Sequence, residues 1–282
     1  MLNLQKIIID RLVSEIETAY KQNYGSRSPS LADTIAWCGY LALENIANSD
    51  ALYHNMDHTV MVTLVGQTIL QGKHLLEGGV TPEDWLHVMV ALLCHDIGFV
   101  RGVCRQDKGD RIATGIGDET VALPSGFTDA ALAPYHVDRG KLFIRERFLQ
   151  PLFIEIDTNA IASYIEMTRF PIPPDPYYQR TGGYAGLVRA ADFIGQLGDP
   201  DYLRKLPALF YEMEEVDKVA KIGYNSLGDM RRNYARFYWD VVSPYIQDAL
   251  DYLRFTQEGK QWITNLHAHV FDVEHRASMA QP

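Results

Sequence analysis

The chain has 282 residues, of which 47% are hydrophobic, so it is long enough and apolar enough to form a substantial core. Its formal net charge is −10, and its pI lies near 5.3. This acidic balance argues against extended nucleic-acid binding, because phosphate backbones are held mainly by clustered Lys and Arg. We therefore expect a folded protein in which any anionic substrate meets a local positive site.

The three cysteines form no CxxC pair, which favours a reducing compartment over a disulfide framework. The first helix-like segment mixes charged and apolar residues, unlike a signal peptide. The longest informative apolar run, Val88 to Cys94, is far shorter than the roughly 20 residues that cross a bilayer. The sequence thus predicts a cytoplasmic protein with no membrane segment.

Apolar residues recur at three- and four-residue spacing, while two-residue alternation is scarce, which indicates an all-α protein. Glycine and proline mark the connections, and Thr81-Pro82 is a strong helix start. The polar tail from Ala268 to Pro282 is expected to fray. The predicted helices cover 2–23, 31–47, 58–77, 83–96, 138–149, 158–169, 184–197, 201–221 and 229–256.

The segment Tyr53-His54-Asn55-Met56-Asp57-His58 contains two histidines four residues apart, which lie on one face if a helix has begun. One histidine could bind a metal while the other works beside it. The alternative is a pair of helix-end histidines that only form structural hydrogen bonds. This segment alone is therefore weak evidence for a site.

Two further segments carry ligand-type residues within apolar helical patterns. One ends abruptly in His95-Asp96, and imidazole and carboxylate are both good ligands for divalent ions. In the other, Asp192 interrupts an apolar face, where a bare carboxylate would be costly to bury. The alternatives are a helix-end role for His95-Asp96 and a salt bridge between Asp192 and Arg189.

Together the three segments resemble the HD superfamily of metal-dependent phosphohydrolases, whose pattern is a His, a His-Asp pair and a distant Asp. The resemblance implies that His58, His95, Asp96 and Asp192 bind a divalent metal. It implies an HD-domain helical bundle with a metal-binding core at 50–200. Residues 1–49 and 201–282 would be helical additions, and 1–282 would form a single helical domain.

The YHNxxH motif is also similar to the cyclic nucleotide phosphodiesterases of that superfamily, in which the first His donates a proton. By this resemblance His54 is the general acid. Those enzymes have a further His after the His-Asp pair, whereas this chain reads Ile97-Gly98-Phe99. That departure argues against a cyclic nucleotide as the substrate.

A second metal position is left open by the sequence. His136 lies where some HD proteins supply a His to a second metal, the alternative being an ordinary helix-start histidine. Six-ligand members have another His before the final Asp, and Glu166 or water could replace it here. We expect one tight ion of Fe, Mn, Co, Ni or Zn, and a weaker second position that would also accept Mg.

The substrate is expected to be held by the positive loop that follows the His-Asp pair, with Arg101, Arg105 and Lys108 on phosphate oxygens. A solvated charged loop is the alternative. Tyr178, in the proline-rich stretch 170–183, is expected to line the pocket for a ring.

The expected function is a metal-dependent phosphohydrolase that cleaves a phosphate mono- or diester through attack by metal-bound water, with His54 and Asp96 as catalytic residues. A small phosphorylated molecule is the expected partner, and a nucleotide is one candidate. Two alternatives stay open. They are a di-iron oxygenase of HD-type fold and a non-catalytic, metal-binding regulatory domain.

Overall fold

The computed structural model describes residues 3–25, 28–148, 155–217, 219 and 222–279, and it confirms the predicted all-α class. The helices are α1 (Leu4–Tyr24), α2 (Pro29–Ile46), α3 (Met56–Glu77), α4 (Pro82–Cys94), α5 (His136–Phe148), α6 (Thr158–Glu166), α7 (Gly183–Leu197), α8 (Tyr202–Glu215), α10 (Leu227–Arg232), α11 (Tyr234–Phe237), α12 (Ser243–Leu253) and α13 (Gln257–Met279). Short 3₁₀ turns include η1 (Ile97–Phe99) and η2 (Asp129–Leu132).

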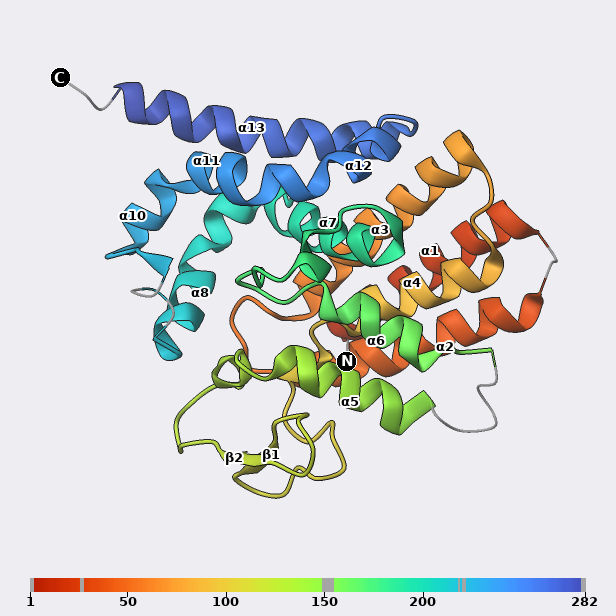
Figure 1. Cartoon of the computed structure of the whole chain (residues 1–282), viewed down its shortest axis with the longest axis horizontal. Helices are drawn as coiled ribbons and strands as arrows, with labels where there is room; N and C mark the ends of the chain where they lie inside the picture. The colour runs from red at the N-terminus through yellow and green to blue at the C-terminus, as the bar shows by residue number, and fades with distance from the viewer. Residues whose placement is uncertain (1–2, 26–27, 149–154, 218, 220–221, 280–282) are drawn as a thin grey trace.

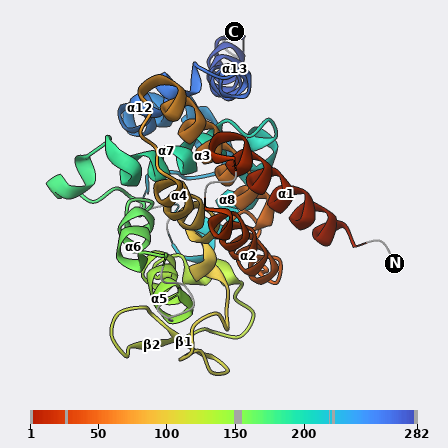
Figure 2. The same ribbon diagram turned by 90° about the vertical axis from the view of Figure 1, so that its right-hand side faces the viewer.

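A small antiparallel hairpin, β1 (Arg111–Ala113) and β2 (Thr120–Ala122), lies in the connection between α4 and α5. It projects beside α5, while α12 and α13 lie along the opposite side of the molecule (Figure 1). The turned view keeps the same arrangement, with α3, α4 and α7 between these two ends (Figure 2). No helix in the described part of the chain is both long and apolar enough to span a bilayer.

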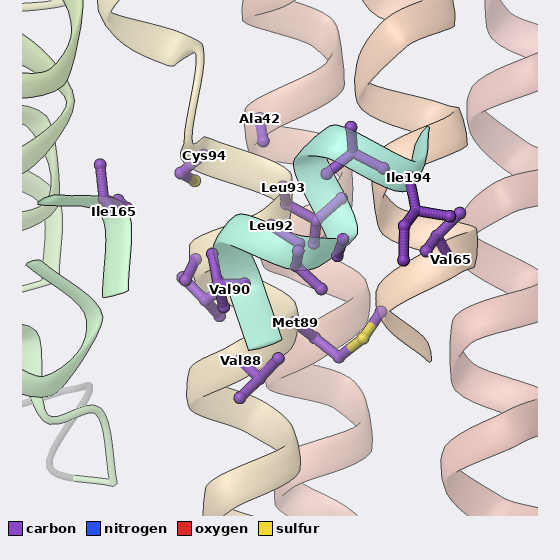
Figure 3. Packing of buried hydrophobic residues seen from close by; sticks show 14 of the residues in the cluster. Ala42, Val65, Val88, Met89, Val90, Leu92, Leu93, Cys94, Ile165 and Ile194 are labelled. Atoms are coloured by element: carbon purple, nitrogen blue, oxygen red, sulfur yellow. The ribbon is translucent and has the colours of Figure 1, made fainter. Parts of the chain in front are cut away.

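Helix α4 lies in the centre of the core because it is apolar on nearly every side. Trp85, Leu86 and every residue from Val88 to Cys94 are buried. Figure 3 shows side chains of this helix, such as Met89 and Leu92, among residues from neighbouring helices. The helix contacts α2, α3, α6 and α7. A ligand placed at its end is therefore held by the core.

Capping residues fix where α3 and α4 begin. The Asn55 side chain accepts hydrogen bonds from the backbone N–H groups of Asp57 and His58, so α3 starts between the two histidines of the first motif. Thr81 and Asp84 form a capping box at the start of α4, as Thr81-Pro82 predicted. These caps set the position of each helix that delivers a histidine.

Two glycines let α3 lie unusually close to its neighbours. A Cβ on Gly66 would lie 2.2 Å from Leu92 Cδ1 of α4. A Cβ on Gly195 of α7 would lie 2.7 Å from the Cα of Val62. A methyl group at Gly195 would meet the backbone of Val62 and push the helices apart, whereas one at Gly66 would displace the Leu92 side chain. The spacing of α3 and α7 thus depends on Gly195.

The C-terminal part differs from the sequence prediction in two ways. The expected helix 229–256 is divided into α10, α11, a π-helical segment (Tyr238–Val242) and α12, where Pro244 lacks the N–H that a continuous ladder requires. The expected fraying from Ala268 is wrong up to Met279, because α13 continues and Val270 and Val273 are buried. The remainder, 280–282, lies outside the described residues.

Candidate metal centre

Three helices bring the predicted ligands together. His58 lies in the first turn of α3, His95 follows the last residue of α4, and Asp192 projects from α7. One ligand atom from each lies within 4.8 Å of the others. His58 Nε2 is 3.2 Å from Asp192 Oδ1 and 3.4 Å from His95 Nε2. The predicted triad therefore converges on one point.

Asp96 contributes a second carboxylate to the same place. Its Oδ2 lies 3.1 Å from His95 Nε2 and 3.4 Å from His58 Nε2. This oxygen is buried and has no hydrogen-bond partner among the residues that the structure describes. A buried carboxylate oxygen without a donor is costly, and a bound cation would remove that cost.

The distances fit a transition-metal ion. Bond lengths of about 2.0 to 2.2 Å place neighbouring ligand atoms roughly 3.0 to 3.5 Å apart in octahedral or tetrahedral geometry. The Nε2 atoms of His58 and His95 lie 3.1 to 3.7 Å from the carboxylate oxygens of Asp96 and Asp192. His95 Nδ1 donates to the Leu92 carbonyl at 2.7 Å, which leaves Nε2 as the nitrogen directed at the cluster. His95 is thus oriented as a metal-ligating histidine is.

His95 and Asp96 each shift the pKa of the other. Burial opposes charge on His95, but the Asp96 and Asp192 carboxylates outweigh it and raise the pKa of His95 to about 9. Burial would also raise the pKa of Asp96, but the surrounding imidazoles, His95 foremost, hold it well below its usual value. The Asp96 side chain is consequently a carboxylate, which is the state a metal needs.

His54 lies beside the cluster and is bonded to a residue that the sequence analysis missed. Its Nδ1 pairs with Glu212 of α8, and Glu212 also accepts from the backbone N–H groups of Tyr53 (2.6 Å) and His54 (3.2 Å). Burial alone would lower the pKa of His54, but Glu212 outweighs it and raises that pKa. The same pairing overcomes burial and lowers the pKa of Glu212. His54 is thus held in place by an ionised partner.

Glu212 could have been recognised by the criterion that selected Asp192. It occupies the apolar face of α8 together with Leu209 and Met213, and only 4% of it is exposed. The surrounding run Glu-Met-Glu-Glu concealed it, because Glu214 and Glu215 make the segment look like an ordinary solvated helix end.

His136 approaches the other side of Asp96. Its Nε2 lies 3.9 Å from Asp96 Oδ1, and its Nδ1 bonds the Ala133 carbonyl at 2.7 Å. Phe99 is stacked between the rings of His136 and His54, with centroid distances of 4.5 and 4.6 Å. Gly98 permits this approach, since a Cβ there would lie 1.9 Å from the His136 carbonyl oxygen. Phe99 is therefore an apolar spacer between the two histidines.

Glu166, the suggested substitute ligand, belongs to a separate network between α5 and α6. It forms ion pairs with Lys141 and Arg169, and it accepts from the Tyr178 hydroxyl at 2.6 Å. Burial opposes its charge, but these donors prevail and lower its pKa to about 2. The suggestion that Glu166 ligates a second metal is therefore not supported, because its carboxylate is used elsewhere.

A cavity of about 120 Å³ adjoins the candidate centre. Its polar end is formed by His54, Asp96, His136, Asp192 and Glu212. Aromatic and aliphatic side chains make up most of the remaining wall. The cavity thus joins an ionisable end to an apolar interior.

The four predicted substrate-binding residues do not line this cavity. Arg101 forms ion pairs with Asp129 and, at 2.8 Å, with Asp50. Its guanidinium thus holds the loop against η2. Arg105 donates to the Glu146 carbonyl, and Lys108 is exposed, with its backbone paired to Arg111. Tyr178 instead bonds Glu166.

Two buried arginines hold the surrounding loops. Arg139 is fully buried and donates to the carbonyls of Gly98, Val100 and Ala113 and to the Asp107 carboxylate. Arg189 donates to the carbonyl groups of Tyr178 and Arg180. The alternative in which Arg189 neutralises Asp192 is therefore not supported, because its donors face the proline-rich stretch.

Fold and site together define an all-helical protein with a candidate metal centre of histidine and aspartate. The chain belongs to the Npun_R2479-like family, whose model matches residues 2–276. No curated protein matches the chain.

Proposed function

We propose that the chain is a metal-dependent phosphohydrolase of the HD kind that cleaves a phosphate mono- or diester. The observation that carries this proposal is that the Nε2 atoms of His58 and His95 lie 3.1 to 3.7 Å from carboxylate oxygens of Asp96 and Asp192, and that the Asp96 oxygen is buried with no hydrogen-bond partner among the described residues. Fe, Mn, Co, Ni and Zn all suit this set of nitrogen and oxygen donors.

A divalent ion bound there would lower the pKa of water toward about 7 and neutralise charge on a phosphoryl group. The other steps belong to side chains of this chain. Glu212 raises the pKa of His54, which favours the protonated imidazole, and His54 lines the same cavity as Asp96 and Asp192. Since Nδ1 faces Glu212, Nε2 is the nitrogen that remains to protonate a leaving oxygen.

A di-iron oxygenase is a second candidate because of one observation. His136 Nε2 lies near the Asp96 oxygen that faces away from the four-residue cluster, so Asp96 could bridge to a second, weaker position. An oxygenase would need a well-ligated second iron, and Glu166 does not supply a ligand. A regulatory, non-catalytic role would give no chemical function to the partly buried pair of His54 and Glu212.

The test combines metal analysis of the purified protein with a panel of phosphate mono- and diesters and an oxygen electrode. The expected result is one tightly held transition-metal ion, with phosphoester hydrolysis that chelation abolishes and metal restores. Oxygen consumption without hydrolysis would favour the oxygenase, and full activity in the chelated protein would exclude the proposed centre.

A further inference from the structure

The walls of the cavity that adjoins the candidate centre are apolar. Helix α7 supplies Phe193, α8 supplies Leu209 and Met213, and α11 supplies Phe237. Phe170 closes the proline-rich side. Such a wall excludes water and gains free energy only from a ligand that brings apolar surface to it.

Apart from the histidines, the charged side chains that face the cavity are all acidic. Asp96, Asp192 and Glu212 are its carboxylates, and no Lys or Arg occurs among its described lining residues. A polyphosphate chain would add several negative charges that a single metal ion cannot neutralise. One phosphoryl group is therefore the most that this end can accommodate.

Several polar side chains of the wall form hydrogen bonds with their own neighbours. Gln196 donates its amide to the Tyr202 hydroxyl at 3.0 Å. Thr168 donates to the Ile165 carbonyl at 2.9 Å, and the Tyr234 hydroxyl donates to the Leu197 carbonyl at 3.5 Å. Reading the edge of a nucleobase needs free donors and acceptors, and these contacts use several that the wall could offer.

We infer that the substrate of this centre is a single phosphate ester of an apolar, uncharged alcohol, and that it is not a nucleotide. The apolar group enters between α7, α8 and α11, and the phosphoryl group stays at the end that carries His54 and Asp192. This inference rests on the proposed function, since it names the substrate class of the same site.

The test measures binding of phosphonates, which cannot be hydrolysed, to the metal-loaded protein by calorimetry. Benzylphosphonate and methylphosphonate share the anionic head and differ in apolar surface. We expect benzylphosphonate to bind at least about 10-fold more tightly, because each buried methylene-sized group contributes about fourfold. Equal affinities, or tighter binding of adenosine monophosphate, would overturn the inference.

A matched pair of variants locates the effect on α8. Met213→Gln makes the cavity wall polar, whereas Leu203→Gln changes a partly buried residue of the same helix outside the cavity lining. Met213→Gln should remove most of the benzyl preference, while Leu203→Gln should keep it. The same preference in both variants would show that the benzyl group binds elsewhere and would contradict the inference.

The same protein distinguishes failure of the inference from failure of the proposed function. Binding of 2-naphthol, which carries no phosphate, to metal-free protein reports on the apolar cavity alone. If 2-naphthol binds and Met213→Gln weakens it, the apolar specificity stands even when no ester is hydrolysed. If esters are hydrolysed but no ligand prefers an apolar group, the hydrolase stands and the inference falls.

Discussion

Two histidines four residues apart have different surroundings in the candidate centre. His58 Nε2 lies against Asp96 and Asp192, with only 3% of its side chain exposed. His54 has 23% of its side chain exposed, and it pairs with Glu212 outside the ligand cluster. At the scale of single residues, the structure thus places His58 within the candidate ligand cluster and His54 outside it.

His54→Ala should retain the metal and lower turnover by roughly 100-fold or more on esters with poor leaving groups. Esters with a nitrophenolate leaving group should lose much less, because that oxygen departs with little protonation. The measurement compares both substrates on both proteins, with metal determined in each preparation. Equal losses with metal retained would exclude proton donation, and loss of metal would make His54 a ligand.

Glu212→Gln provides the companion measurement. The carboxylate raises the pKa of His54, and the protonated imidazole is the proposed acid, so activity should fall as pH rises through that pKa. Without the negative charge the pKa of His54 drops, and the alkaline limb of the pH profile should move to lower pH. An unmoved limb would contradict the role of this pair.

Asp96→Ala should lower both bound metal and activity, because it removes a buried carboxylate from two imidazole neighbours. The matched control is Asp57→Ala, which removes an exposed carboxylate from the first turn of α3. Metal content and circular dichroism should be measured on both. Full metal occupancy in Asp96→Ala would refute the assigned ligand set.

At the scale of helices, the spacing between α3 and α7 sets the geometry of the candidate centre. Gly195 follows Asp192 by one turn of α7, and Val62 follows His58 by one turn of α3, so their close approach sets the distance between those two ligands. Helix ends matter as well, because His95 is placed by the end of α4. The ligand geometry is therefore a property of packed helices.

Gly195→Ala should destabilise the fold by about 1 to 3 kcal/mol, because its methyl group would meet the Val62 backbone. It should also weaken metal binding by about 10-fold or more as α3 and α7 separate. The control is Gly140→Ala in α5, where the nearest atom would lie at an ordinary 3.5 Å. Urea unfolding and metal titration of both test this, and unchanged metal affinity in Gly195→Ala would refute it.

The contact between α5 and α6 depends on Glu166, whose folded-state pKa of about 2 lies below its ordinary 4.5. The ionised group therefore stabilises the fold above about pH 4.5, and this contribution disappears as pH falls toward 2. Glu166→Gln should cost about 1 to 3 kcal/mol at neutral pH and flatten that acid dependence. Exposed Glu119→Gln is the control, and an unchanged pH dependence of unfolding in Glu166→Gln would contradict the network.

Over the whole molecule, the sequence predicted the helical class and the ligand cluster from local patterns. Apolar periodicity located most helices. The four-residue spacing from His54 marked His58, and ligand-type residues within apolar runs marked His95 and Asp192. It could not predict partners distant in the chain, such as Glu212 for His54, because nothing local encodes which helices meet. For the same reason the sequence predicted a phosphate contact for Arg101 and did not reveal its ion pairs, because the carboxylates that pair with it lie far from it in sequence.

The expected domain layout was a metal-binding core at 50–200 with helical additions at both ends. Residues after 200 nevertheless enter the site, since α8 supplies Glu212 and part of the cavity wall. The C-terminal helices also pack on the core, with α12 against α3 and α7. A fragment limited to 50–200 would lack the partner of His54, so functional measurements need the whole chain.

The buried guanidinium of Arg139 has a consequence for cooperativity. The loop after Asp96 cannot open without breaking its bonds to Gly98, Val100 and Ala113 and uncovering a charge. Amides in this loop, such as Ala113 N–H on Asp107, should therefore exchange hydrogen for deuterium as slowly as core helices do. Exchange at the rate of an ordinary surface loop would contradict this. If the loop opens only when the core unfolds, loss of a bound metal and global unfolding occur in one transition.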